Sequence, residues 1–236
     1  MKDYDVTTLE IIERTPTCLS VRTGKPEGFT FMAGQWGLFT PVASGITEGK
    51  PLSFSSSPTE PFLEFTKRIS GSAFSGGIRS LRPGDPVHFR GPAGNLVLEG
   101  GEGKILFVVG GIGITPIRSI LRYMADSGHE SDGTLLFANR SLDEIPFREE
   151  LESMASGGSW LRVIHVLEDP PTGWKGPTGF VTLDTLREQV SDLKERAIFL
   201  CGPPPMVSCL EGMLSELGVP ENRVRKEQLE GYEGLT

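Results

Sequence analysis

The chain has 236 residues, of which 37% are hydrophobic and 23% are charged, so it can bury a core without disulfides or metals. Its net charge of −8 argues against sequence-independent nucleic-acid binding and against a strong hold on anionic membranes, since both need a large basic surface. The start of the chain is charged, and the longest apolar run, residues 105–114, is short and broken by glycines. These features predict a cytoplasmic protein without a secretory signal or a transmembrane segment.

The first part of the chain predicts short strands rather than helices. Clusters of Gly, Pro and Ser separate the apolar runs, and only residues 76–81 suggest a short helix. The candidate strands are residues 5–12, 18–23, 36–41, 62–69 and 86–91. This pattern predicts an antiparallel β-barrel or sandwich.

From Lys104 onward, strands and helices alternate. Helical spacing follows each apolar strand, and the boundary falls in the glycine-rich segment 99–104, which gives domains at residues 1–99 and 104–236. The candidate strands are residues 105–109, 134–139, 161–167, 196–202 and 222–229, and the candidate helices are residues 117–124, 142–154, 182–193 and 206–217. Such alternation predicts an α/β domain with a parallel sheet and helices on both faces.

The stretch VVGGIGITP, residues 108–116, follows the first strand of this second part. Gly110, Gly111 and Gly113 allow a close backbone approach, while Thr115 suits a helix N-cap and Pro116 the first helical position. A strand, a glycine turn and a helix start together make an anion site suited to a pyrophosphate. A tight turn without a ligand is the alternative, because short glycine motifs give many false positives.

A second stretch, FLCGPPPM at residues 199–206, ends another strand of the same predicted sheet. Ligands of open parallel sheets bind at that edge, and the Cys201 thiol suits the floor beneath a flat ring, although a buried core cysteine is the alternative. Cys18 and Cys209 are expected in the core, Cys209 because it lies on the apolar stripe of a helix. Three cysteines give neither a disulfide framework nor a four-cysteine iron–sulfur site.

Two polar stretches lie in the first part. KPLSFSSSP, residues 50–58, has a cation and hydroxyls that could bind a phosphate and a heteroaromatic edge, or form a plain polar loop. A local basic excess could bind phosphates or dock an acidic partner, or be an ordinary solvated face. It consists of Lys67, Arg68, Arg79, Arg82 and Arg90.

Together these motifs, in this order, resemble the ferredoxin–NADP⁺ reductase superfamily, flavoproteins that pass electrons between a nicotinamide nucleotide and another acceptor. KPLSFSSSP resembles its R-x-Y-[ST] flavin motif, and residues 71–95 resemble its phosphate loop and barrel end. GGIGITP resembles its nucleotide turn, and CGPPPM its C-G-P-P motif. The resemblance implies a six-stranded antiparallel barrel that binds FAD, followed by an α/β nucleotide-binding domain with a parallel sheet.

On the flavin side, the resemblance places Lys50 where the family has an arginine for the pyrophosphate and Leu52 where it has a stacking tyrosine. Both replacements weaken the motif, and they leave FMN as an alternative cofactor. Ser53 falls where a hydroxyl approaches flavin N5, and Ser75 falls where one meets the pyrophosphate. The strand expected along the flavin carries Phe65, Thr66 and Lys67.

On the nucleotide side, the resemblance places Cys201 near the nicotinamide C4. Glu227 is a weaker candidate for proton handling, with a surface carboxylate at a strand end as the alternative. Tyr232 could cover the flavin, as C-terminal aromatics do in the family, or belong to a disordered tail. Together with Ser53, Cys201 and Glu227 form the candidate catalytic set. The residues expected to cradle the dinucleotide are Gly110, Gly111, Gly113, Thr115, Pro116, Arg140, Cys201, Gly202, Pro203 and Met206.

The expected donor is NADH rather than NADPH. Arg140 could bind a 2′-phosphate, but Asp143, Glu144, Glu168 and Asp169 surround it in sequence and disfavour a further dianion. The stretch FANRSLDEI also resembles that of NADH-using cytochrome b5 reductases.

The resemblance implies an NAD(P)H-dependent flavin oxidoreductase. Bound FAD would take a hydride and pass electrons to a separate acceptor, such as a ferredoxin-like protein, a cytochrome or an oxygenase component. No fused ferredoxin domain is expected, because the cysteines for one are missing. Two alternatives stay open: a nucleotide-binding or regulatory subunit without flavin, and a flavin reductase that uses free flavin as its substrate.

Overall fold

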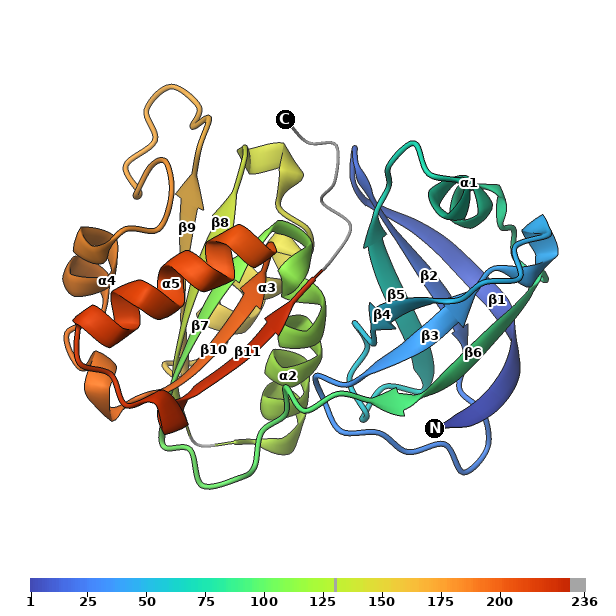
Figure 1. Ribbon diagram of the computed structural model, residues 1–236, viewed down its shortest axis with the longest axis horizontal. Coiled ribbons are helices and arrows are strands. Elements are labelled where there is room, and N and C mark those ends of the chain that lie inside the picture. Colours follow the sequence, from blue (N-terminus) through green and yellow to red (C-terminus); the bar gives the residue numbers. More distant parts are fainter. Residues whose placement is uncertain (130, 230–236) are drawn as a thin grey trace. The chain divides into compact units, whose positions relative to one another are not determined.

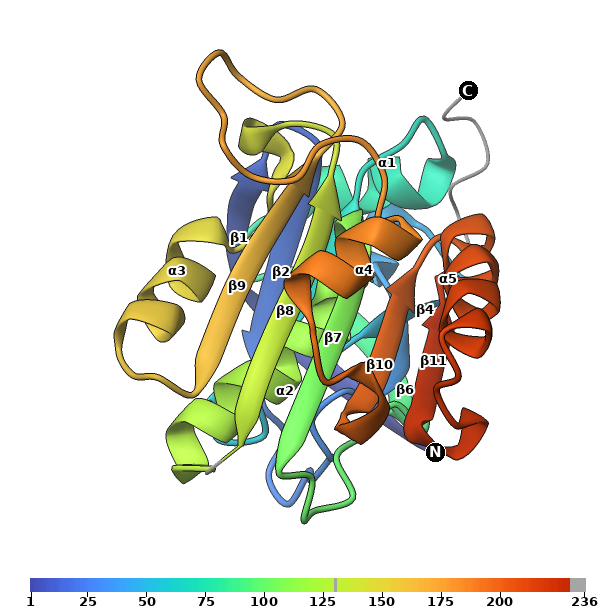
Figure 2. The ribbon, with the colours of Figure 1, turned by 90° about the vertical axis from the view of Figure 1, so that its left-hand side faces the viewer.

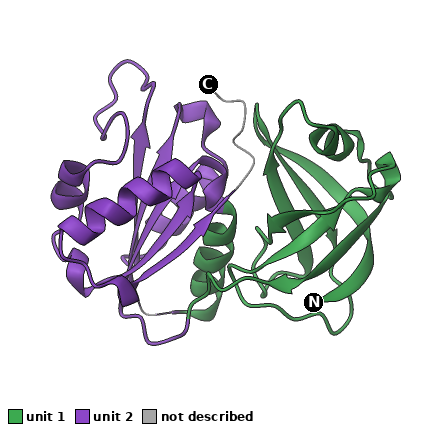
Figure 3. Ribbon diagram, viewed as in Figure 1, with its two compact units in different colours: residues 1–98, 115–128 green, residues 99–114, 129–236 purple. Residues whose placement is uncertain are grey.

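The computed structural model describes residues 1–129 and 131–229, so Tyr232 lies outside the described residues. The chain forms two compact units, coloured separately in Figure 3. The first comprises Met1–Leu98 with Thr115–Gly128, and the second comprises Glu99–Ile114 with His129–Thr236. The division at Leu98 falls beside the predicted boundary, but the segment 115–128, which the sequence places in the second domain, is counted with the first unit.

The first unit contains a six-stranded antiparallel barrel (Figure 1). Its strands follow the order β4-β3-β6-β1-β2-β5, and a bridge between Phe54 and Phe65 joins the two outer strands. The elements are β1 Lys2–Thr15, β2 Cys18–Gly24, β3 Trp36–Thr40, β4 Lys50–Ser53, β5 Phe62–Arg68, α1 Ala73–Ser80 and β6 Pro86–Ala93. The predicted barrel is therefore confirmed.

Aromatic side chains fill the barrel. Phe39, Phe54 and Phe89 are fully buried, and Phe65 is only 1% exposed. Ring centroids lie 4.7 Å apart for Phe39 and Phe65, and 5.2 Å apart for Phe54 and Phe65. Because aromatic rings bury large apolar areas, this cluster supplies much of the apolar core of the barrel.

The second unit contains a five-stranded parallel sheet in the order β11-β10-β7-β8-β9 (Figure 2). A buried cluster packs α4 and α5 on one face, and α3 approaches the other face through Glu152, near His165. The elements are β7 Lys104–Gly110, β8 Asp132–Asn139, α3 Arg148–Ser156, β9 Leu161–Leu167, α4 Leu183–Gln189, β10 Ala197–Gly202, α5 Pro204–Glu216 and β11 Val224–Gln228. The predicted parallel sheet with helices on both faces is confirmed.

Helix starts differ most from the sequence predictions. Helix α2, Ile114–Ser127, begins before Thr115, so the predicted N-cap at Thr115 and the predicted first helical position at Pro116 are both wrong. A 3₁₀ turn at Gly111–Gly113 leads into the helix. Helix α3 begins only at Arg148, because Phe147 has a left-handed backbone with φ of 60°. A residue with this backbone conformation cannot continue a right-handed helix, so a helix through the preceding residues would end there.

One burial prediction was wrong. Cys209 is exposed on α5, where Val207, Leu210 and Leu214 form the buried stripe instead. In the first unit, residues 50–53 form strand β4, and the segment that follows Phe54 is a loop whose three serines are fully buried rather than solvated. Cys18 lies in the core, as predicted.

Candidate functional site

The glycine turn and the C-G-P-P motif lie against each other in the second unit. A Cβ on Gly110 would lie 2.3 Å from the Met206 sulfur, and one on Gly113 would lie 2.3 Å from the carbonyl oxygen of Cys201. Gly113 therefore has no room for a side chain, because main-chain atoms of Cys201 lie in the way, whereas at Gly110 the nearest atom belongs to the flexible Met206 side chain. Gly111 has a φ of 51°, which glycine adopts without strain. The structure thus brings together two motifs that are far apart in the sequence.

This junction lies at the carboxyl end of the sheet. Strands β7 and β10 are parallel neighbours, with Val109 opposite Cys201, and both end here. A Cβ on Gly202 would lie 3.2 Å from the Gly110 nitrogen, and Pro203 begins the chain's entry into α5. Open parallel sheets bind ligands at this edge, so the arrangement suits a dinucleotide.

Cys201 is fully buried on β10. Burial raises the pKa of its thiol well above the usual value, and the charge of Glu227 raises it further. Glu227 is the register partner of Cys201 on the neighbouring strand β11. The thiol is therefore neutral at physiological pH and offers a soft apolar surface rather than a nucleophile.

Thr115 and Pro116 lie in the first turn of α2, directly after the glycine turn. Thr115 is 2% exposed, and Pro116 is also buried. A proline in the first helical turn leaves no backbone hydrogen bond unmade, since the first N–H groups of a helix have no partner within it. A helix start of this kind is compatible with the predicted anion site, which stays a prediction.

The segments that follow β8 and β9 are hydrogen-bonded to each other. The Asp169 N–H donates to the Arg140 carbonyl at 2.7 Å, and the Glu168 N–H donates to the Asn139 carbonyl at 3.1 Å. The Arg140 side chain is 74% exposed, and its Nε lies 3.1 Å from Asp169 Oδ2. Arg140 therefore already has a carboxylate partner. Beside it, a hydrogen bond from Ser141 lowers the pKa of Asp143.

Phe180 is a feature of this edge that sequence reasoning missed. Its ring is 72% exposed, and the preceding Gly179 donates its N–H to the Leu167 carbonyl at the end of β9, at 2.7 Å. A single phenylalanine in a Gly/Pro-rich loop gives no periodic signal, so only the structure places it here. An exposed ring at a ligand edge can stack on a flat base.

On the flavin side, strand β4 presents the predicted motif. Lys50 is exposed and pairs loosely with Glu48, at 3.5 Å, so its ammonium is accessible to an anion. Leu52 packs in part against the barrel core, and Ser53 is only 4% exposed, opposite Trp36 of β3. The leucine that replaces the family's tyrosine thus contributes apolar packing to the barrel.

The predicted residues of β5 face in different directions. Phe65 points into the aromatic core, so only its main chain is available for contact with a ligand. The Thr66 hydroxyl is hydrogen-bonded to those of Ser20 and Ser55, each at 2.7 Å. Lys67 is partly buried; its Nζ donates to the Arg68 carbonyl, and burial lowers its pKa.

Ser75 belongs to a cluster of hydroxyls at the start of α1. Its N–H donates to the N-cap Ser72 at 3.2 Å, and its Oγ accepts the N–H of Ser70 at 3.1 Å. A Cβ on Gly71 or Gly76 would meet nothing within 4 Å, so the space around this helix start is open. A helix N-terminus with hydroxyls and open space fits a phosphate group.

One member of the predicted basic cluster makes hydrogen bonds that stabilise the fold. Arg82 Nη1 donates to the carbonyls of Arg79, Ser80 and Leu81 at the end of α1, at 2.9 to 3.2 Å. The Arg82 guanidinium therefore caps a helix end, although Arg82 is exposed, as are Arg79 and Arg90 of the same set.

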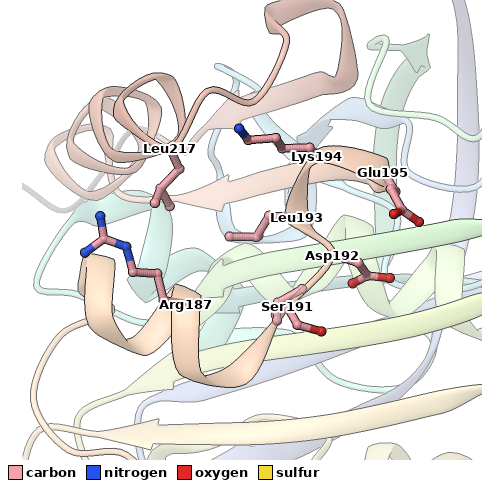
Figure 4. Close-up of a pocket in the computed structure, with 8 residues that line it drawn as sticks. Arg187, Ser191, Asp192, Leu193, Lys194, Glu195 and Leu217 are labelled. Atoms are coloured by element: carbon pink, nitrogen blue, oxygen red, sulfur yellow. The ribbon is translucent and has the colours of Figure 1, made fainter.

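A separate surface hollow of about 350 Å³ lies in the second unit (Figure 4). It is lined by Arg187, Val190, Ser191, Asp192, Leu193, Lys194, Glu195 and Leu217. Asp192 pairs with Arg196 at 2.6 Å, which holds its pKa at about 2, and with Lys104, the first residue of β7. The hollow is therefore at the amino ends of the strands, opposite the glycine turn, and it is not the nucleotide site.

Residues 107–211 match the model of the oxidoreductase NAD-binding domain. NADH-cytochrome b5 reductase 1 from Emericella nidulans is 36% identical over 157 residues, which cover 62% of this chain and 50% of that protein. The chain thus spans about half the length of the curated relatives it matches.

Among solved structures, an Amycolatopsis cytochrome P450 reductase has a TM-score of 0.85 at 25% identity, covering 96% of this chain and 69% of that one. A ferredoxin NADP⁺ reductase from Neisseria gonorrhoeae has a TM-score of 0.82 at 19% identity, covering 97% and 99%. The chain therefore has the fold of these two reductases, and residues 107–211 resemble an oxidoreductase NAD-binding domain, as the motifs predict.

Proposed function

We propose that the chain is an NADH-dependent flavin oxidoreductase that delivers electrons to a separate acceptor protein. The observation that carries this proposal is the junction of the glycine turn with the C-G-P-P motif, inside a matched oxidoreductase NAD-binding domain. Glycine at position 113 lets the two motifs pack closely at the carboxyl ends of β7 and β10, the edge where open parallel sheets bind their ligands. The names of the relatives, NADH-cytochrome b5 reductases, support the same activity.

The first unit has residues that fit a flavin nucleotide. The start of α1, with Ser72 and Ser75, suits the pyrophosphate, and the accessible ammonium of Lys50 adds a positive charge. Ser53 would place a hydroxyl beside the isoalloxazine ring. When bound, FAD would accept a hydride from NADH and release the electrons to the acceptor.

The protein's own contribution is mainly positional. In this proposal the neutral Cys201 thiol forms the floor of the nicotinamide site, where burial excludes water. Ser53 is nearly buried and would offer its hydroxyl to the flavin. Glu227, next to Cys201 on β11, is the remaining acid–base candidate. Within each unit, residues held in place in this way orient their own ligand before it reacts.

NADH is the proposed donor. Arg140, the cation nearest in sequence to a possible 2′-phosphate site, is paired with Asp169, and Glu168 and Asp143 add negative charge. The exposed Phe180 ring at the same edge is the proposed stacking partner of the adenine.

A cytochrome of the b5 type is the acceptor that the relatives' names favour. A cytoplasmic location stays a prediction; no helix of the described residues is long and apolar enough to cross a membrane.

A visible absorption spectrum, recorded before and after anaerobic addition of NADH, tests the proposal. Flavin bands that bleach with NADH would support it. Bleaching by NADPH alone would overturn the choice of donor. A colourless protein that binds NADH and does not take up FAD would favour the regulatory-subunit alternative, while turnover of added free flavin without tight binding would favour a flavin reductase.

A further inference from the structure

Two consecutive side chains of α2 bind two consecutive carbonyls of the flavin-motif region. Arg118 Nη1 donates to the Ser55 carbonyl at 2.9 Å, and Ser119 Oγ donates to the Ser56 carbonyl at 2.6 Å. All four residues belong to the first unit. We call residues 55–60 the serine loop. It begins two residues after Ser53, the hydroxyl predicted to face the flavin.

A buried ion pair fixes the other end of this loop. Arg118 is 4% exposed, and its guanidinium contacts both carboxylate oxygens of Glu60, with Nη2 to Oε1 at 3.0 Å. Glu60 Oε2 also accepts the N–H of Ser57 at 2.6 Å. A buried guanidinium is stable only when its donors are paired, so the serine loop cannot shift without leaving a charge unpaired.

The loop is connected to the strand predicted to line the flavin. The Ser55 hydroxyl bonds that of Thr66 at 2.7 Å, and Ser56 Oγ accepts the N–H of Glu64 at 3.0 Å. A displaced serine loop would therefore move β5 as well as the end of β4. Arg118 acts on both strands without itself being part of either.

We infer that Arg118 is a positioning residue of the flavin site: it fixes the serine loop, and through it Ser53 and Thr66, from a helix that begins at the nucleotide turn. This inference rests on the proposed function. It goes beyond that function by assigning flavin affinity to a residue of the segment that follows GGIGITP. Pre-organised loops bind ligands more tightly because less order has to be imposed on binding.

The test measures the dissociation constant of FAD, from the fluorescence of flavin released on dilution, together with the unfolding temperature. For Arg118→Gln we expect the constant to rise about ten-fold or more. Arg196→Gln is the matched control, since Arg196 is also buried, at 6% exposure, and pairs with Asp132 and Asp192 in the second unit. The unfolding temperature of this control variant should fall, while its dissociation constant for FAD should stay within about two-fold of that of the unaltered protein.

Two further variants separate positioning from stability. In R118Q/E60Q no buried carboxylate is left unpaired, so we expect the unfolding temperature to recover while FAD binding stays weak. Arg118→Lys keeps the charge but not the fork that binds Ser55 and Glu60 together, and should show an intermediate FAD constant even if Arg118→Gln does not fold. Unchanged FAD affinity in these variants would overturn the inference. An unaltered protein that binds no flavin would instead overturn the proposed function.

Discussion

Arg140 and Asp169 form an ion pair across the carboxyl ends of β8 and β9, with 3.1 Å between Arg140 Nε and Asp169 Oδ2. A main-chain hydrogen bond between the same residues, at 2.7 Å, holds the two segments together. The guanidinium that could bind a 2′-phosphate is therefore occupied by a carboxylate from the next strand. Under the proposed function, this competition and the neighbouring acids disfavour NADPH.

Replacing Asp169 by Asn should improve binding of the 2′-phosphate. Without the carboxylate, Arg140 is available, and we expect the affinity for 2′-phospho-AMP to rise about five-fold, the range of an exposed ion pair. Isothermal titration at low ionic strength measures it. Asp143→Asn is the control, because Asp143 accepts from Ser141 rather than from Arg140. An equal gain in affinity for 2′-phospho-AMP in both variants would show that net charge, and not release of Arg140, controls the choice between NADH and NADPH.

The sequence predicted the barrel and the α/β unit well, because both architectures are indicated by local sequence patterns. The alternation of strands and helices after Lys104 and the glycine and C-G-P-P motifs need no long-range information. Strand β4 was missed as a strand, because its four residues include Pro51 and carry no alternation of apolar and polar side chains. Helix α3 starts late because of the positive φ at Phe147, which no propensity indicates for a phenylalanine.

The site was predictable in its motifs but not in its contacts. Sequence placed Phe65 on the strand expected along the flavin, yet the strand's alternation turns that ring into the barrel. Arg118 and Glu60 are separated by 58 positions, so nothing local identifies them as partners. Cys209 was assigned to the core from helical spacing, but α5 is rotated so that Val207 and Leu210 face the sheet instead.

Gly113→Ala should destabilise the second unit. The new Cβ would lie 2.3 Å from the carbonyl oxygen of Cys201 and 2.7 Å from its carbonyl carbon, both main-chain atoms that cannot rotate away. Overpacking of this kind costs about 1 to 3 kcal/mol, and NADH binding should weaken with it. Urea unfolding and a fluorescence titration with NADH measure the two effects.

Gly212→Ala is the matched control for that substitution. Gly212 lies inside α5, and a Cβ there meets nothing within 4 Å. Alanine favours the helix by about 1 kcal/mol over glycine, so this variant should be slightly more stable. If Gly113→Ala unfolds at the same urea concentration as the unaltered protein, the close approach of the two motifs is wrong.

The three cysteines should differ sharply in reactivity. Cys201 is fully buried with a raised pKa, Cys18 is buried in the barrel, and Cys209 is exposed. Since the thiolate is the reactive species, a thiol-specific chromogenic disulfide should react quickly with Cys209 alone. The Cys209→Ser variant should lose the fast phase, and denaturant should restore reactivity at the other positions. Rapid labelling of Cys201 in the folded protein would contradict its burial on β10.

His88 should stabilise the barrel at low pH. A hydrogen bond with Asp5, at 2.9 Å, is the main cause that raises the His88 pKa; Asp3, at 3.2 Å, adds to it, and partial burial opposes it. The stabilisation is therefore fully present below the ordinary value of 6.5 and is lost as pH rises through the folded-state pKa. Urea midpoints of the unaltered protein and of His88→Gln should differ most at acidic pH and converge at alkaline pH. A constant difference would contradict the ion pairing.

His165 should have the opposite effect. Burial lowers its pKa, Glu152 at 3.8 Å opposes that shift and Arg148 adds to it. Its ring nitrogens are buried and have no hydrogen-bond partner among residues 1–129 and 131–229. The neutral ring is thus compatible with the fold above the ordinary value of 6.5, and stability is lost as pH falls from there through the folded-state pKa. His165→Gln should abolish this loss, so its urea midpoint should fall less between pH 7 and pH 5 than that of the unaltered protein. A steeper fall would mean that the charged ring is stabilised by Glu152 rather than excluded by burial.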